Sequence, residues 1–332
     1  MKHKISDPID ILAIGDIVTD AFIRLKEATV NCEIDHTNCK LCVPFGEKIP
    51  YESVDVIKAV GNSANAAVSA ARLGLNSALL SYVGDDTDGV DCIEELKRNK
   101  VITDFVRTEK GKKTNYHYVL WYDVERTILI KHEQFDYSLG DIGTPRYIYL
   151  SSLGENSLPF HTEIASFVAH HPETKLVFQP GTFQIRLGKD TLKDIYQHTE
   201  IFFCNVEEAQ KILSVTSRDI KSLLKGIASL GPRYIFITDG IEGAYAYDGN
   251  DFWFIPTYPH EPIERTGAGD AFASTVVSAL ASGLTPKEAL MWGPINSMSV
   301  VQQVGAQRGL LSREKLEEYL KNAPPQYTIH QL

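Results

Sequence analysis

Short apolar runs alternate with helical segments along much of the chain, and this alternation restricts the fold more than any other feature. Runs typical of buried strands lie at 9–16, 77–83, 147–150, 176–179, 200–204 and 234–239. Helices are predicted near 158–170, 188–198, 206–230, 268–282, 286–303 and 312–321. Parallel strands need crossover connections, which are usually helices. The pattern therefore predicts an α/β fold, a doubly wound and mostly parallel sheet with helices on both faces.

Two segments do not follow this alternation. Residues 26–58 show poor periodicity, and residues 112–133 contain two alternating β-type runs around a turn, as a hairpin would. We expect one domain over residues 1–332, with a small β-sheet lid formed by about 20–60 and 100–135. Since a small sheet that buries one face leaves the other in need of a partner, we also expect a homodimer through the lid.

The composition excludes several classes of function. The 332 residues include 33 basic and 43 acidic side chains, for a formal net charge of −10. This balance argues against non-specific nucleic-acid binding, which depends on cations that neutralise phosphates. No stretch approaches the roughly 20 apolar residues of a membrane helix, and the first apolar run is that of a strand, not of a signal peptide. We expect a cytoplasmic protein without a membrane partner.

Three of the five cysteines lie close together with a histidine, at Cys32, His36, Cys39 and Cys42. Four such side chains match a zinc site in number, but the compact span lacks the usual long loop between ligand pairs. A local disulfide is a second interpretation. Because an odd cysteine count without a secretion signal argues against a disulfide framework, we expect reduced thiols in a surface segment.

The stretch from Glu264 to Gly283 begins with a glycine turn and continues as an apolar helix. A glycine turn at a helix N-terminus leaves backbone N–H groups free, with the positive end of the helix dipole behind them, and so favours an anion. Asp270 within this turn suits a different task, since a carboxylate there is placed to take a proton from an attacking hydroxyl. Phosphoryl transfer requires both features together.

This stretch resembles the second signature of the ribokinase-like carbohydrate kinases, the pfkB family. The resemblance implies that Gly267, Ala268 and Gly269 form the anion hole and that Asp270 is the catalytic base. It also implies ATP as the phosphoryl donor, Mg²⁺ as the cofactor and a sugar hydroxyl as the acceptor. A nucleoside, a sugar phosphate and a non-catalytic relative that only binds a sugar or nucleotide remain as alternatives.

Two earlier stretches resemble the family's acceptor-binding motifs. Asp20, in GDIVTD, matches the aspartate that holds two sugar hydroxyls, and a carboxylate has two oxygens to offer two donors. Residues 60–65, VGNSAN, resemble the family's Gly-Gly-x-x-x-Asn helix start, although Val60 replaces its first glycine. The resemblance assigns Gly61, Asn62 and Asn65 to the acceptor.

The remaining motifs concern the nucleotide and cations. Asn205 and Glu208 resemble the Asn-x-x-Glu motif that organises magnesium, which keeps several waters of its own. The resemblance assigns Thr238, Gly240, Gly243 and Asn296 to the nucleotide. Glu264 and Thr266 stand where many members build a monovalent-cation site, here a candidate site for K⁺, although Glu264-Arg265-Thr266 departs from the usual Asp-Thr-Thr.

Aromatic residues are unusually frequent in the second lid segment, at Tyr116, Tyr118, Trp121 and Tyr122. Such side chains suit stacking on a nucleobase, which would favour a nucleoside acceptor. They are equally typical of residues that pack a lid's own faces or a dimer contact, and we favour that interpretation.

Overall fold

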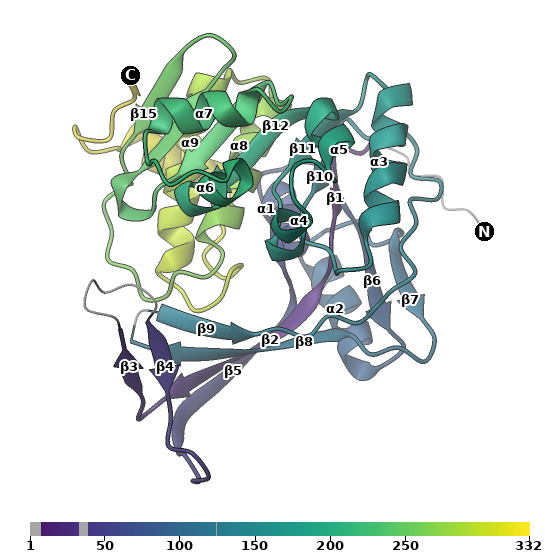
Figure 1. The fold of residues 1–332 in the computed structure, drawn as a ribbon, viewed down its shortest axis with the longest axis vertical. Helices are drawn as coiled ribbons and strands as arrows, with labels where there is room; N and C mark the ends of the chain where they lie inside the picture. Colours follow the sequence, from purple (N-terminus) through teal and green to yellow (C-terminus); the bar gives the residue numbers. More distant parts are fainter. Residues whose placement is uncertain (1–7, 33–38, 124) are drawn as a thin grey trace.

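The computed structural model describes residues 8–32, 39–123 and 125–332, and a ten-stranded sheet runs through its centre (Figure 1). Its strands are β1 (Ile11–Ile14), β6 (Ser77–Gly84), β7 (Val106–Glu109), β10 (Tyr147–Leu150), β11 (Lys175–Phe178), β12 (Thr199–Asn205), β13 (Tyr234–Thr238), β14 (Ala244–Tyr247), β15 (Phe252–Ile255) and β16 (His330–Gln331). Strands β7-β6-β1-β10-β11-β12-β13 are parallel in that order, and β14, β15 and β16 extend the sheet in antiparallel fashion. The predicted doubly wound, mostly parallel α/β fold is confirmed.

Helices cover both faces of this sheet. One face carries α1 (Asn62–Arg72), α2 (Thr87–Arg98), α8 (Ala268–Ala281), α9 (Pro286–Val301) and α10 (Arg313–Lys321). The other carries α3 (Leu158–His170), α4 (Thr182–Leu187), α5 (Lys193–His198), α6 (Val206–Leu213) and α7 (Ile220–Ala228), and a 3₁₀ turn, η1 (Gly240–Glu242), follows β13. Strand residues alternate between the two cores, since Ile11 and Ala13 belong to one core and Leu12 and Ile14 to the other. Of the helices in the described residues, none combines the length and apolarity needed to cross a membrane.

Two predicted helices differ from those observed. The segment 206–230 is divided into α6 and α7, because Ser214 adopts a left-handed conformation with φ 58° and Asp219 caps the next helix. In the predicted segment 188–198 only the last six residues are helical, as α5, and a separate short helix, α4, lies before the segment. Gly188, with φ 86°, ends α4. Capping residues inside a periodic pattern therefore shortened these helices.

Small side chains in α8 allow it to pack closely between α1 and α9. Its residues from Asp270 to Ala279 are buried, and most of them are alanine, serine, threonine or valine. The first turn of α8 shares a cavity with residues at the carboxyl ends of several strands, Ser152, Gln179, Asn205 and Thr238. Ligands of open α/β sheets bind at this edge of the strands.

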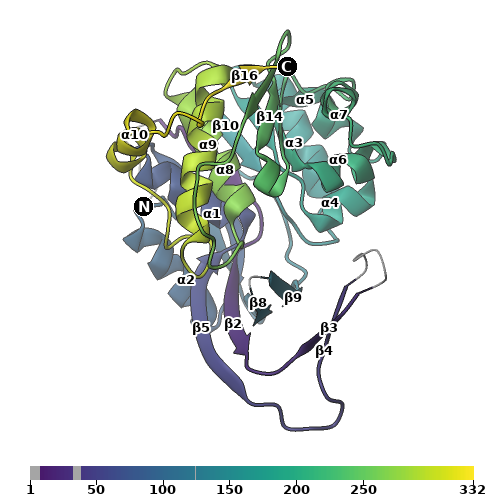
Figure 2. The same cartoon turned by 90° about the vertical axis from the view of Figure 1, so that its left-hand side faces the viewer.

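A smaller sheet forms the lid, built from β2 (Val18–Leu25), β5 (Tyr51–Val60), β8 (Asn115–Tyr122) and β9 (Glu125–Leu129) in the order β5-β2-β8-β9. Figure 2 shows it projecting from the body, with a hairpin of β3 (Thr29–Asn31) and β4 (Lys40–Cys42) beyond it. The second lid segment begins later than expected, because β7 pairs with β6 in the large sheet.

Alternation divides the lid into two faces. Asp20 of β2 lies opposite His117 of β8, and both side chains line a cavity against the body. Exposed apolar side chains gather on the opposite face, where Val54, Val56, Tyr118 and Leu129 are 47%, 45%, 51% and 52% exposed. The lid therefore buries one face against the body and leaves an apolar face outside.

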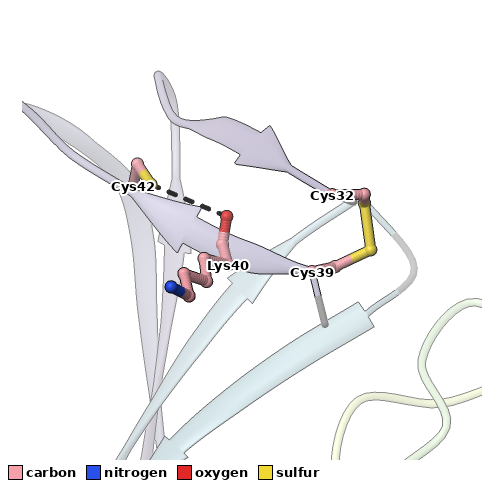
Figure 3. Close-up of a disulfide and its surroundings, with 4 residues drawn as sticks. All are labelled: Cys32, Cys39, Lys40 and Cys42. Atoms are coloured by element: carbon pink, nitrogen blue, oxygen red, sulfur yellow. Dashed lines mark hydrogen bonds between the residues drawn. A yellow bond between two sulfur atoms is a disulfide. The ribbon is translucent and has the colours of Figure 1, made fainter. Parts of the chain in front are cut away.

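Cys32 and Cys39 form a disulfide, which corrects the expectation of reduced thiols (Figure 3). Antiparallel pairing of Asn31 with Lys40 places Cys32, which follows Asn31, opposite Cys39, which precedes Lys40, with their Cα atoms 4.0 Å apart. Cys42 remains a free thiol, and its sulfur accepts a hydrogen bond from Asn31 Nδ2. His36, the fourth residue of the zinc interpretation, lies outside the described residues.

Candidate active site

Gly267 begins α8 in a conformation that other residues rarely adopt. Its φ is 80°, and a Cβ atom there would lie 2.4 Å from Ala306 Cβ. Glycine is therefore required for the turn. Because the first amides of a helix have no partner within it, this turn directs free N–H groups and the positive end of the dipole at the adjoining cavity.

Asp270 lies in the first turn of α8 and is buried. Three side-chain amides donate to its carboxylate: Asn62 Nδ2 at 2.8 Å, Asn65 Nδ2 at 2.7 Å and Gln179 Nε2 at 3.2 Å. Gln307 Nε2 in turn donates to Asn65 Oδ1 at 3.0 Å, which fixes the orientation of that amide. Burial raises the pKa of Asp270, while the amide hydrogen bonds and the charge of Arg126 oppose this rise. The three amides thus hold the carboxylate in one orientation. Because an amide is not a base, Asp270 is the member of this cluster that can accept a proton.

A cavity of about 390 Å³ lies between the lid and the body, with Asp270 in its wall. All four predicted acceptor residues line it: Asp20, Gly61, Asn62 and Asn65. Gly61 has φ 109°, and a Cβ atom there would lie 2.6 Å from the carbonyl oxygen of Asp16, so this backbone approach also requires glycine. The sequence motifs for the acceptor therefore meet at one place.

Two histidines, His117 and His132, also line this cavity, and each contacts an aspartate. Sequence reasoning identified neither histidine. His117 Nδ1 lies 3.4 Å from Asp20 Oδ1. His132 Nδ1 lies 2.7 Å from Asp16 Oδ2, and the Tyr137 hydroxyl donates to the same carboxylate at 2.9 Å. Asp16 and Gln179 both follow buried parallel strands, which is a usable signal, whereas the histidines belong to the lid and gave none.

Asn205 and Glu208 hold each other at the start of α6. The Glu208 amide donates to Asn205 Oδ1 at 2.8 Å, and the Asn205 amide donates to Glu208 Oε2 at 2.9 Å. This reciprocal pairing is a capping box, but both residues also line the cavity that contains Asp270. Burial raises the pKa of Glu208, and the nearby Asp270 charge adds to this. A divalent cation close to both carboxylates would relieve this accumulation of negative charge.

A second cavity of about 480 Å³ adjoins the first, and it is lined by Thr238, Gly240 and Gly243, the residues that the sequence assigned to a nucleotide. The two cavities share Thr238, Arg265, Ala268, Gly269 and Phe272, so they meet at the glycine turn. Asn296 does not line either cavity. It is fully buried, donates to Thr275 Oγ1 at 2.7 Å and accepts from the Leu311 amide at 3.0 Å, so it supports the packing of α9 on α8.

Glu264 is fully buried immediately before the glycine turn. Its Oε1 atom accepts hydrogen bonds from the Thr266 amide at 2.7 Å and from Thr266 Oγ1 at 2.5 Å, so the two candidates for a cation site bind each other. In the described part of the chain, no three His, Cys, Asp or Glu side chains gather as a metal ion would require. Any cation here would depend on ligands from backbone, water or phosphate.

None of the lid aromatics that suggested a nucleobase lines the acceptor cavity. Tyr116 and Tyr118 lie on the side of β8 opposite His117, and Trp121 is buried with the Arg24 guanidinium over its ring. Alternation along β8 explains the two tyrosines, because successive side chains point to opposite faces. Trp121 lies on the same side as His117 but four residues further along the strand, beside Arg24. These aromatics therefore contribute to the lid itself.

Comparison with known proteins places the chain among sugar kinases. A sequence profile described as "pfkB family carbohydrate kinase" matches residues 28–313. The chain is 27% identical over 270 residues to ribokinase of Bacillus subtilis, covering 78% of this chain and 87% of the relative. It is 25% identical over 250 residues to fructoselysine 6-kinase of Escherichia coli, covering 74% and 90%. An E. coli protein assigned as ribokinase II, in complex with ATP and Mg²⁺, shares the fold with a TM-score of 0.74 at 17% identity, covering 95% and 99%.

Proposed function

Because the chain belongs to the pfkB family of carbohydrate kinases, we propose that it transfers the γ-phosphoryl group of ATP to a sugar hydroxyl, with Asp270 as the base. One observation carries the assignment of the base. A buried carboxylate, held by three amide donors, lies beside the glycine turn at which the two cavities meet. A donor in one cavity and an acceptor in the other would meet at this carboxylate.

The transfer follows from this arrangement. Asp270 takes the proton of the acceptor hydroxyl, whose oxygen forms a bond to the γ-phosphorus while the bond from phosphorus to the bridging oxygen of ADP breaks. The amides at Gly267, Ala268 and Gly269 donate to the phosphoryl oxygens as charge moves through them. The lid excludes water, which limits wasteful hydrolysis of ATP.

Magnesium fits the cavity through Asn205 and Glu208, which would hold it by way of bound water. The partly buried Glu208 carboxylate, whose pKa is raised by desolvation, supports this, since a cation would stabilise its ionised form. When bound, Mg²⁺ withdraws negative charge from the phosphate oxygens. Activation by K⁺ at Glu264 and Thr266 stays a prediction.

A free sugar is the acceptor that the cavity favours. Asp20 with its partner His117, and Asn62 and Asn65, offer donors and acceptors suited to hydroxyl groups. The lid aromatics Tyr116, Tyr118 and Trp121 are absent from the cavity wall, so they offer no stacking partner for a nucleobase. Phe183, Phe203 and Phe272 do line the cavity, and a nucleoside acceptor therefore stays the alternative. The test is transfer from ATP to a mixed panel of sugars, nucleosides and sugar phosphates. Clear binding of a ligand without turnover would favour the non-catalytic alternative.

Replacing Asp20 by alanine is expected to raise the acceptor KM by about 10- to 100-fold, as loss of hydrogen bonds to a charged group would. The ATP KM should change little, because Asp20 lies on the lid strand β2 and does not line the nucleotide cavity. Steady-state kinetics with each substrate varied in turn measures both constants. Asp55→Ala, elsewhere in the lid, is the control. Equal increases in both constants would make Asp20 a structural residue.

The exposed lid face supports a homodimer. Val54, Val56, Tyr118 and Leu129 form an apolar patch on a small sheet, and a second copy of the same face would cover it by two-fold symmetry. A cytoplasmic location also stays a prediction. The Cys32–Cys39 disulfide counts against it, because disulfides are rare in that compartment.

Replacing Val56 by aspartate is expected to release monomers, since the new charge would be buried in the dimer contact. Light scattering at micromolar concentration measures the mass, and the acceptor KM should rise together with the loss of the dimer. Val215→Asp, an exposed apolar position outside the lid, is the control. A wild-type protein that is monomeric and fully active would contradict this arrangement.

A further inference from the structure

Two crossed ion pairs join lid strand β9 to the loop before α8. Each segment contributes a glutamate followed by an arginine, and each glutamate faces the arginine of the other segment. Arg265 Nη1 lies 2.9 Å from Glu125 Oε1, and Arg126 Nε lies 3.6 Å from Glu264 Oε1. The position of the lid is thereby linked to the segment that forms the anion hole.

The two pairs differ in burial. In the outer pair the side chains of Arg265 and Glu125 are 44% and 61% exposed, so this pair contributes little to stability. In the inner pair Arg126 is 28% exposed and Glu264 is fully buried. Among the described residues, Arg126 Nε and Glu264 Oε2 are buried without a hydrogen-bond partner. Because Arg126 keeps some exposure and lines the cavity beside the glycine turn, its guanidinium is suited to bind a further anion there.

The location of Arg126 identifies that anion. Arg126 lines the same cavity as Asp270 and the residues of the glycine turn. Its charge also opposes the rise in the pKa of Asp270 that burial causes. Arg24, another arginine of the lid, lies outside this cavity, where it pairs with Glu52 and stacks on Trp121. An anion at this position would be the phosphoryl group between donor and acceptor.

We propose that Arg126 is a catalytic residue that the lid carries to the transferring phosphoryl group, and that Glu264 holds it in position. This proposal rests on the proposed kinase function. Arg126 stays protonated throughout and takes no part in the proton transfer to Asp270. It donates hydrogen bonds to oxygens that gain charge in the transition state, and such donors contribute about 10²- to 10³-fold to kcat. A lid that opens removes this charge, so transfer is limited to the closed state.

The test compares Arg126→Ala with Arg24→Ala, a lid arginine outside the cavity. Arg126→Ala should lower kcat by about 10²- to 10³-fold with a change in ATP KM of less than about threefold, whereas Arg24→Ala should retain kcat. Added guanidinium chloride should restore part of the activity of Arg126→Ala, and KCl at the same concentration should not. The acid limb of its pH profile should also move to higher pH, because the loss of a positive charge raises the pKa of the base.

The charged and titratable groups that face Asp270 limit the pH argument. Besides Arg126 they are Glu208 of α6 and Tyr149 of β10, each of which interacts with Asp270 by charge. Asp20, His117, His132 and Arg265 also line the same cavity. None of these groups is changed in Arg126→Ala, so a shift between wild type and this variant reports the arginine.

Three outcomes would overturn the proposal: unchanged kcat in Arg126→Ala, equal loss in Arg24→Ala, or restoration by K⁺ as effective as by guanidinium. Absence of transfer by the wild-type protein to every acceptor tested would instead refute the kinase function, and the role of Arg126 with it.

Discussion

Replacing Asp270 by asparagine is expected to lower kcat by about 10²- to 10⁴-fold, the contribution of a positioned general base. The amide keeps the size of the side chain but cannot accept the hydroxyl proton. ATP should bind with a dissociation constant near the wild-type value, because Asp270 lines the acceptor cavity and not the nucleotide cavity. Single-turnover kinetics and ATP titration measure the two quantities separately. Near-normal turnover in this variant would refute the assigned role.

The pH dependence provides a second measurement on the same residue. Only the ionised carboxylate can accept a proton, so kcat/KM should fall as the pH decreases through the pKa of Asp270. Because burial raises this pKa, the fall should begin at a higher pH than for an exposed aspartate, whose pKa is about 3.9. The limb should be absent from the residual activity of Asp270→Asn. A limb that persists unchanged would assign it to another group.

Gly267→Ala is expected to reduce kcat by at least about 10²-fold and the free energy of unfolding by about 1–3 kcal/mol. The added Cβ would meet Ala306 Cα at 2.6 Å and Ala306 Cβ at 2.4 Å, in a backbone conformation with φ 80°. The turn must therefore shift, and its amides with it. Gly283→Ala is the matched control, since Gly283 is also left-handed, with φ 92°, but its added Cβ would meet open space.

Urea unfolding and steady-state kinetics separate the two causes. Both variants should lose the stability that a left-handed alanine costs, about 1–2 kcal/mol, and only Gly267→Ala should lose kcat. If Gly283→Ala lost as much activity, or Gly267→Ala lost none, the turn would not be the anion hole that we propose.

The sequence predicts those parts of the fold and site whose signals are local. Strand and helix alternation predicted the large sheet, and the motif around Asp270 located the glycine turn, because each depends on neighbouring residues. Asp16 and Gln179 could have been found by the same reasoning, since each follows a buried strand. The capping that divides the segment 206–230 is also local, but Ser214 is not a residue that usually ends a helix.

Long-range register explains what the sequence did not predict. His117 reaches the cavity because β8 pairs with β2 in the register that places His117 opposite Asp20. That register cannot be predicted from the sequence. Arg126 and Glu264 are far apart in the sequence, and they pair because β9 lies beside the loop that precedes α8. The disulfide was missed for a similar reason, because it follows from the pairing of β3 with β4 and not from cysteine spacing alone.

The acceptor cavity lies between two parts of the molecule, the lid and the body. The lid contributes Asp20, His117 and Arg126 to its wall, and the body contributes Asn62, Gln179 and Asp270. A sugar bound there would contact the lid and the body at the same time, and the length of the sugar would determine how far the lid closes. Selectivity among sugars would then be expressed in kcat as well as in KM, because a sugar of the wrong size would be retained with Arg126 too far from the phosphoryl group. A longer or shorter lid strand could adapt this enzyme to a new acceptor without any change in the residues that touch ATP.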